Sequence, residues 1–198
     1  MPQLRCMGCA LMLVGSATRC GDCQRQPPAF THTVCAVDYA FPWDHLIVGL
    51  KYHGMVELAA PLAGVMARAV QATALVMPEL VLPVPLSRAR MAERGFNQAW
   101  ELARRVAATL HLATTAHALE RVVDTAHQTE LGRAQRRANL RAAFVVPTAQ
   151  QAALSGRHVA LVDDVMTTGA TAEEASQALL RAGVAAVEIW VLARTPAQ

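Results

Sequence analysis

The chain has 198 residues, of which 54% are hydrophobic, and this is enough apolar material for one good core and a small appendage. Its formal net charge of +3 permits a phosphate-rich partner without identifying one. No apolar run reaches the roughly 18 residues of a membrane-spanning helix, so we expect no membrane insertion.

Two C-x-x-C pairs lie near the N-terminus, and they supply four of the five cysteines: Cys6, Cys9, Cys20 and Cys23. Each pair places two thiolates on a tight turn, and two such turns can complete a tetrahedral zinc site. Because four thiolates leave no open coordination position, we expect a structural zinc ion. Redox-active or metal-free thiols and a different metal are the alternatives. The fifth cysteine, Cys35, lies in an apolar run and is expected in the core.

The N-terminal apolar patch, residues 10–14, is short for a secretory signal and has cysteines on both sides. We therefore expect a cytoplasmic protein, in whose reducing environment metal binding is favoured over disulfides. Two consecutive prolines, Pro27 and Pro28, indicate a linker. The predicted division is a zinc ribbon module over residues 1–28 and a main domain over residues 29–198.

The main domain begins with an apolar run that favours a strand, residues 34–40. A short helix is predicted over residues 43–52, and an amphipathic helix over 55–73. A second strand is predicted over 80–84, followed by a loop and a long helix to about Leu110. The loop suits an anion, although a solvated charged loop is the alternative. Its polar residues and glycine are Arg88, Arg90, Arg94, Gly95 and Asn97.

An arginine-rich segment follows a possible strand over residues 118–122. If the segment is helical, Arg133, Arg137 and Arg141 share one face, and Arg136 lies beside them. A basic helix face of this kind is often only solvated.

The most informative stretch is residues 158–171, which reads HVALVDDVMTTGAT. Residues 159–162 form a short, continuous apolar run that is typical of a parallel strand buried on both faces. Carboxylates are costly inside a sheet, so we expect Asp163 and Asp164 just past the edge of the strand. Ligands of open α/β sheets bind beyond the carboxyl ends of the strands.

A small hydroxyl-rich turn follows the acidic pair, and it consists of Thr167, Thr168, Gly169, Ala170 and Thr171. Gly169 supplies either a positive φ or room for a close phosphate. A helix is predicted over 172–182 and a strand over 185–192. Backbone N–H groups of the turn and of the helix start can bind a phosphate, and the carboxylates can hold sugar hydroxyls or hydrated Mg²⁺. The alternatives are an ordinary capped helix and a Walker-B-like strand end, but the chain has no G-x-x-x-x-G-K-[ST] loop.

Residues 159–171 resemble the phosphoribosyl diphosphate (PRPP) binding motif of type I phosphoribosyltransferases. This resemblance implies that Asp163 and Asp164 face the ribose hydroxyls as the catalytic acids. It also implies that the segment from Thr167 to Thr171 surrounds the 5′-phosphate, with Mg²⁺ accompanying PRPP.

Several stretches together resemble the ComF family, a phosphoribosyltransferase-like group linked to natural competence for DNA uptake. They are the C-x-x-C pairs, LKYHG, PVPLSRARMAERGFNQ, HQTELGRAQRRANLRAAF and LVDDVMTTGAT. The resemblance implies an α/β fold: a type I phosphoribosyltransferase-like core with a parallel sheet, and a small N-terminal zinc ribbon with four cysteine ligands. It implies that Arg88, Arg94, Gly95 and Asn97 flank the pyrophosphate. It also implies a mobile loop that carries Gln128, Arg133, Arg136, Arg137 and Asn139, where arginines stand in place of the catalytic lysine of some related enzymes.

Three functions follow from this resemblance. The first is an enzyme that transfers the phosphoribosyl group of PRPP to a nucleophile. The second is an accessory protein of DNA uptake that binds single-stranded DNA or a competence motor protein. The third is a metabolite sensor that acts through closure of the mobile loop.

Overall fold

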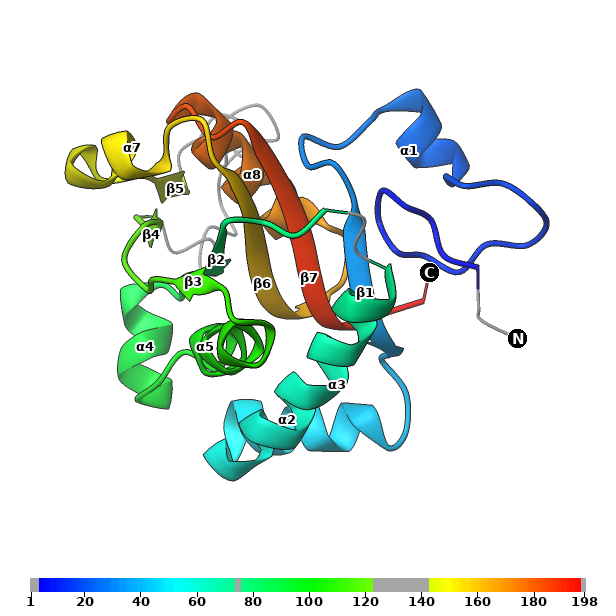
Figure 1. Ribbon diagram of the computed structural model, residues 1–198. Coiled ribbons are helices and arrows are strands. Elements are labelled where there is room, and N and C mark those ends of the chain that lie inside the picture. Colours follow the sequence, from blue (N-terminus) through cyan, green and yellow to red (C-terminus); the bar gives the residue numbers. More distant parts are fainter. Residues whose placement is uncertain (1–3, 74–75, 123–142, 197–198) are drawn as a thin grey trace, which may run out of the picture.

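The computed structural model describes residues 4–73, 76–122 and 143–196. At its centre lies a parallel sheet of five strands in the order β1-β7-β6-β2-β3 (Figure 1). The strands are β1 (Thr33–Asp38), β2 (Leu80–Pro83), β3 (Ala113–Thr114), β6 (His158–Met166) and β7 (Ala186–Arg194). The predicted α/β fold with a parallel sheet is confirmed.

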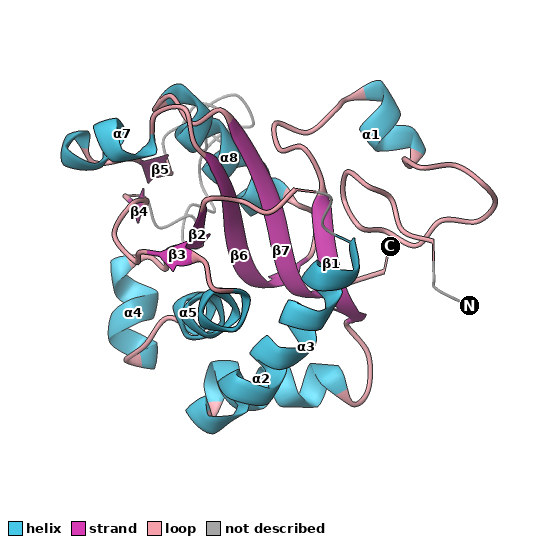
Figure 2. Ribbon diagram, in the orientation of Figure 1, coloured by secondary structure: helices cyan, strands magenta, loops and turns pink. Residues whose placement is uncertain are grey.

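Helices cover both faces of this sheet (Figure 2). The main ones are α2 (Trp43–Tyr52), α3 (Ala59–Thr73), α5 (Gln98–Leu110) and α8 (Ala170–Arg181). On one face, α2, α3 and α5 bury Leu50, Leu62 and Leu102 in a common cluster. On the other face, α8 packs Leu179 against strand residues. Burial on both faces explains why the inner strands read as continuous apolar runs.

Several smaller elements surround the sheet. They are α1 (Gly21–Arg25), the 3₁₀ turn η1 (Val56–Leu58), α4 (Arg88–Arg94), α7 (Thr148–Leu154), and an antiparallel pair of two-residue strands, β4 (Glu120–Arg121) and β5 (Phe144–Val145). The strand predicted over 118–122 is therefore a short element outside the main sheet. The helix predicted over 43–52 has those bounds, whereas the one predicted over 55–73 begins with η1.

The arginine-bearing segment predicted as a loop contains a helix, α4. The Ser87 hydroxyl accepts a hydrogen bond from the N–H of Arg90 at 3.4 Å and caps the helix N-terminus. Gly95, with φ of +75°, ends the helix in the left-handed region. Arg88 and Arg94 therefore have fixed positions on a helix.

Strand β6 is longer than predicted, and this changes the position of the acidic pair. Asp163 lies opposite Val191 of β7, and the pairing of β6 with β7 continues to Met166. On the other side, β2 ends where Pro83 lies opposite Val162. Asp163 and Asp164 are thus inside β6, not past its end, but they lie beyond the end of β2. Because β2 ends before this point, no strand pairs with β6 beside the carboxylates on that side, and a ligand has room there.

The N-terminal segment lies beside β1. Thr33 donates its N–H to the carbonyl of Met7 at 2.9 Å and its hydroxyl to that of Gly8 at 2.6 Å. Arg5 forms an ion pair with Asp38 at 2.9 Å. Within the described ranges, no helix is both long and apolar enough to span a membrane.

Candidate functional site

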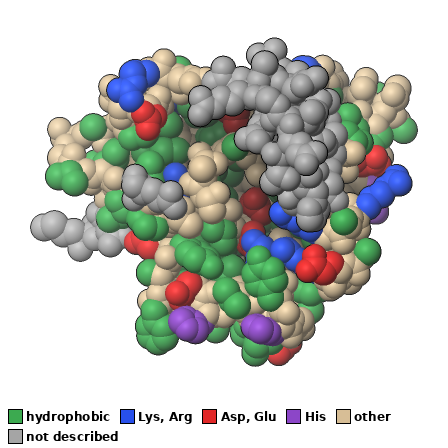
Figure 3. All heavy atoms as spheres, turned by 180° about the vertical axis from the view of Figure 1, so that it is seen from behind, with side chains coloured by type: hydrophobic (Ala, Val, Ile, Leu, Met, Phe, Trp, Pro, Cys, Tyr) green, Lys and Arg blue, Asp and Glu red, His purple; other side chains and the backbone are tan. Residues whose placement is uncertain are grey.

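The acidic pair and part of the hydroxyl turn line one cavity of about 320 Å³ at the carboxyl end of β6. From this part of the chain it receives Asp163, Asp164, Thr167 and Thr171. In the space-filling view, acidic and basic side chains lie close together in a hollow on one face of the molecule (Figure 3). The cavity therefore combines carboxylates and hydroxyls, as the sequence predicts for a sugar phosphate site.

Lys51, on α2, is the basic partner of this acidic pair. Its Nζ lies 2.9 Å from Oδ2 of Asp164, a residue that is only 2% exposed. Oδ1 of Asp164 also accepts the N–H of Val165 at 2.9 Å. Asp164 is thus an ionic and hydrogen-bonded anchor in the wall of the cavity.

Asp163 is in a different electrostatic state from its neighbour. Its partial burial, and then the adjacent carboxylate of Asp164, raise the pKa of Asp163 well above the ordinary range, although Lys51 acts in the opposite direction. Its Oδ1 accepts the N–H of Asp164 at 2.9 Å. A cation or ribose hydroxyls at this position would relieve the repulsion between the two carboxylates.

The hydroxyl turn has two sides. Gly169, directly before α8, has φ of +86°, which is one of the two roles expected for it. The Thr168 hydroxyl accepts the N–H of Ala170 at 3.3 Å. Thr167 and Thr171 line the cavity with the acidic pair, whereas Thr168, Gly169 and Ala170 line a second cavity toward the cysteines. The structure thus places the predicted phosphate-binding residues on one turn but divides them between two cavities.

The predicted pyrophosphate residues are spread over α4 and the start of α5. Arg88, Gly95 and Asn97 line a neighbouring cavity. The Asn97 side chain caps α5 by accepting the N–H of Ala99 at 2.9 Å, and it donates to the carbonyl of Val84 at 3.0 Å. The guanidinium of Arg94 lies 5.0 Å from the centre of the Tyr52 ring. None of these predicted pyrophosphate residues is among those that line the cavity of the acidic pair.

Other residues of the cavity escaped the sequence reasoning, among them Lys51, Tyr39 and Gln98. One signal was available, since Lys51 is the only lysine of the chain and lies in the LKYHG stretch. Arg90, which was named in the loop expected to suit an anion, also lines this cavity. The predicted mobile-loop residues, Gln128, Arg133, Arg136, Arg137 and Asn139, lie outside the described residues.

The four N-terminal cysteines form a cluster in which all sulfur atoms lie within 4.8 Å of one another. None of them is in a disulfide. A Cβ atom at Gly8 would come within 2.8 Å of Cys23 Sγ, so the close approach of the first turn requires glycine. Burial raises the pKa of Cys6, but hydrogen bonds to its sulfur, that of the Cys20 N–H foremost, outweigh it and bring the pKa to about 7. This donor set fits a structural zinc ion.

Comparison with known proteins shows the family of the chain. The family model of the phosphoribosyl transferase domain matches residues 91–198. The DNA utilization protein YhgH of Escherichia coli K12 is 38% identical over 194 residues, which cover 96% of this chain and 84% of that protein. Competence protein F of Haemophilus influenzae is 34% identical over 193 residues, with the same coverage.

The chain belongs to the ComF family. Its described fold is also similar to a solved structure, the glutamine phosphoribosylpyrophosphate amidotransferase from B. subtilis complexed with ADP and GMP. The TM-score is 0.52 at 14% identity, and the match covers 73% of this chain and 30% of that protein. This likeness concerns the fold alone. For this ComF chain, the parallel sheet with a phosphoribosyltransferase-like arrangement is therefore established independently of the motif.

Proposed function

We propose that this ComF-family chain binds Mg²⁺–PRPP in the cavity at the carboxyl end of β6. The observation that carries the proposal is that Asp163, Asp164, Thr167 and Thr171 line the same cavity of about 320 Å³. Such a cavity offers carboxylates for ribose hydroxyls or a hydrated cation, and a turn for a phosphate.

In this proposal each wall of the cavity has a separate role. Asp163 and Asp164 hold the ribose and its Mg²⁺, and the turn from Thr167 to Thr171 binds the 5′-phosphate with backbone N–H groups at the start of α8. Arg90 and Lys51 line the same cavity and would attract the pyrophosphate.

We further propose that the bound sugar phosphate can react as in phosphoribosyl transfer. The C1–pyrophosphate bond would break, a nucleophile would form the new bond at C1, and pyrophosphate would leave. Positive groups on the leaving pyrophosphate and fixed contacts to the ribose would stabilise an oxocarbenium-like transition state. Arg94 and the arginines of the predicted mobile loop are the further candidates for that charge neutralisation.

Titration calorimetry of the full chain with PRPP and Mg²⁺ tests binding. We expect saturable binding, and Asp164→Asn should weaken it by about 10- to 100-fold because a charge-assisted contact is lost. Asp44→Asn, in the first turn of α2, is the control and should bind like the original chain. No binding heat at any Mg²⁺ concentration would refute the proposal. If PRPP binds, pyrophosphate release in the presence of candidate bases tests the transfer reaction.

The cellular context that we propose is DNA uptake, in the cytoplasm, because relatives of high coverage are named as DNA utilization and competence proteins. We also propose that residues 1–28 form a zinc ribbon module and residues 29–198 the phosphoribosyltransferase-like domain. The hydrogen bonds of Thr33 to Met7 and Gly8 support a defined position of that module beside β1.

One cavity favours a second candidate function, the binding of single-stranded DNA. It has a volume of about 600 Å³ and shares Pro85, Leu86 and Arg121 with the first cavity. Phe96, Trp100 and Arg88 line it together. These aromatic residues do not alternate with arginines in the sequence, but folding brings them together, and such a wall suits stacked bases and a phosphate backbone.

Oligonucleotide binding as a function of salt concentration tests this candidate. We expect affinity to fall steeply as salt rises, and Trp100→Leu to weaken binding by about 1–3 kcal/mol. The same variant should keep its affinity for Mg²⁺–PRPP. Absence of binding even at low salt would exclude single-stranded DNA and leave a competence motor protein as the candidate partner.

A further inference from the structure

Arg194, the last residue of β7, is a buried cation that hydrogen-bonds only to oxygen atoms without formal charge. It is 4% exposed, and it forms no ion pair with a carboxylate within the described ranges. Its Nε donates to the carbonyl of Cys9 at 2.8 Å. Its Nη1 donates to the carbonyls of Met166 at 3.1 Å, of Thr195 at 2.7 Å, and of Thr167. A guanidinium held this way has its charge only partly compensated, which is costly in a protein interior.

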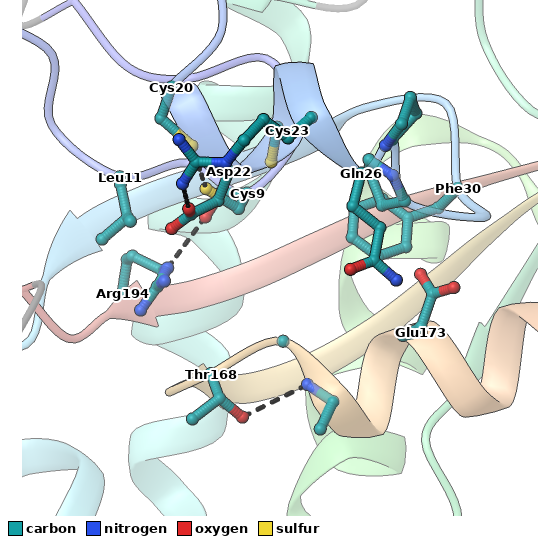
Figure 4. A pocket seen from close by; sticks show the side chains of 15 residues that line it. Cys9, Leu11, Cys20, Asp22, Cys23, Gln26, Phe30, Thr168, Glu173 and Arg194 are labelled. Atoms are coloured by element: carbon teal, nitrogen blue, oxygen red, sulfur yellow. Dashed lines mark hydrogen bonds and ion pairs between the residues drawn. The ribbon is translucent and has the colours of Figure 1, made fainter.

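The partners of Arg194 belong to two sites that are far apart in the sequence. Cys9 is a member of the cysteine cluster, and its Sγ lies 3.6 Å from that of Cys20. Thr167 begins the hydroxyl turn and lines the cavity that also contains the acidic pair. One planar side chain therefore joins the backbone of the cluster to the backbone of the turn. Figure 4 shows its bond to Cys9.

The backbone at Cys9 depends on its surroundings. The next residue, Ala10, has φ of +57°, which an L-residue with a side chain rarely adopts. The turn is closed by the Ala10 N–H, which donates to the carbonyl of Cys6 at 2.8 Å. Such a conformation persists only where the surroundings impose it. A zinc ion on the four thiolates would supply that constraint, together with a net negative charge beside Arg194.

The cluster and the turn are separated by an open space. A cavity of about 430 Å³ has Cys9, Cys20 and Cys23 on one side and Thr168 and Gly169 on the other. In Figure 4, Arg194 lies between Cys9 and Thr168. Other contacts also hold the N-terminal segment to the core, but each reaches one site alone. Glu173 accepts the N–H of Ala29 at 2.8 Å, and Thr33 donates to Gly8.

We propose that Arg194 is a positioning residue that couples metal binding at the four cysteines to phosphate binding at the hydroxyl turn. The inference rests on the proposed function, since it requires the turn to bind the 5′-phosphate of PRPP. With metal-loaded cysteines, the Cys9 carbonyl is fixed and the charge of Arg194 is compensated. Arg194 then holds the carbonyls of Met166 and Thr167, and so orients the N–H groups that follow them. The coupling is reciprocal: a bound phosphate strengthens metal binding by the same factor.

The test compares zinc-loaded and zinc-stripped full-length protein under reducing conditions. Affinity for Mg²⁺–PRPP is measured by calorimetry in the original chain, in Arg194→Met and in the matched variant Thr33→Val. Zinc removal should weaken binding by about fivefold or more in the original chain and in Thr33→Val. In Arg194→Met, the ratio of the affinity of the zinc-loaded protein to that of the zinc-stripped protein should fall to near one. If Arg194→Met does not fold, Arg194→Lys replaces it in the test. Lysine keeps the positive charge but lacks the planar guanidinium with its several N–H donors, so this variant should lower the ratio as well.

Amide hydrogen exchange of residues 165–172 supplies a readout that needs no PRPP, with helix α5 as the reference segment. Zinc removal should speed exchange in that segment for the original chain and for Thr33→Val. In Arg194→Met, exchange there should be fast with and without zinc. A metal effect that is unchanged in the Arg194 variants overturns the coupling, whether it is read by affinity or by exchange. If exchange responds to zinc through Arg194 but PRPP never binds, the structural link from the cysteines to the turn stands, and the proposed PRPP site fails.

Discussion

Asp163 carries an electrostatic cost that the rest of the sheet does not share. Its carboxyl group sits on β6 beside a second carboxylate and partly out of water, and both conditions disfavour its charged form. A sequence selected for stability alone would avoid two adjacent acids at this position. Their presence at the edge of a cavity agrees with the binding role that we propose for them.

The first prediction concerns Asp163→Asn. Because the pKa of Asp163 is raised in the folded chain, the folded state binds more protons than the unfolded state from pH ~4 up to that raised pKa. The free energy of unfolding therefore falls as pH rises through this window, and the asparagine variant lacks this contribution to the pH dependence. Urea unfolding should show the variant more stable at pH 8 by at least about 1.4 kcal/mol, the equivalent of one pKa unit, and nearly equal to the original chain at pH 4.

Asp44→Asn is the control for that measurement. Asp44 lies at the partly exposed start of α2, and the hydrogen bond from His45 lowers the pKa of its carboxyl group. Its removal should give no gain in stability at pH 8. A gain of equal size in both variants would contradict the assignment of the cost to the buried acidic pair.

The second prediction concerns Lys51, whose ammonium neutralises the buried Asp164. Lys51→Met leaves that carboxylate without its cation, and we expect a loss of about 2–4 kcal/mol at neutral pH. The double variant Lys51→Met/Asp164→Asn should lose much less than the sum of the two single variants. Urea unfolding of all four proteins measures this coupling, and simple additivity would show that the ion pair contributes nothing.

At the level of helices and strands, the segment between β2 and α5 shows how capping residues fix the site wall. Asn97 does two things at once: its oxygen caps α5, and its amide nitrogen ties that helix to the carbonyl of Val84 at the end of β2. The start of α5, where Gln98 lies in the cavity wall, is thereby joined to the end of β2.

The third prediction follows from these two contacts. Asn97→Ala loses both and should destabilise the chain by about 1–2 kcal/mol, whereas Asn97→Asp keeps the cap acceptor and should lose less. Thermal unfolding monitored by circular dichroism measures the difference. If Asn97→Asp instead abolished PRPP binding while keeping full stability, Asn97 would be a ligand contact and not a capping residue.

The sequence predicted elements well where the signal is local and poorly where it depends on a distant strand. The helix over 43–52 follows from its own periodicity and has the predicted bounds. The end of β6 cannot be predicted from local periodicity, because it is set by pairing with β7. The helix α4 could have been recognised, since Ser87 and Gly95 are a typical cap and stop.

The candidate site shows the same division. The acidic pair and the hydroxyl turn are contiguous, so their motif was readable from residues 159–171. The contact of Lys51 with Asp164 joins residues 113 positions apart, and only the packing of α2 beside the sheet creates it. The link from Arg194 to Cys9 spans 185 positions and likewise arises from the fold.

Across the whole chain, the N-terminal segment has too little apolar burial to hold its shape without help. Within residues 4–28, the buried positions are Cys6, Gly8, Ala10 and Cys23. Larger hydrophobic side chains of that segment, such as Met12 and Val14, are exposed. Small modules without a core of their own depend on metals or disulfides, and the described cysteines form no disulfide.

The fourth prediction uses the two kinds of cysteine in this chain. Cys20 is in the cluster, whereas Cys35 lies on β1, where burial raises its pKa to about 11 and keeps it a neutral thiol. Cys20→Ser should lose most of the bound zinc and expose the segment 4–28 to proteolysis, since its turns lose their common centre. Cys35→Ser should keep about one zinc ion per chain.

Metal analysis of both proteins, purified without added zinc, decides between these outcomes. Equal zinc content in the two variants would mean that the cluster is not the metal site, and the seat of the N-terminal segment on β1 would then have to come from Thr33 and Arg5 alone.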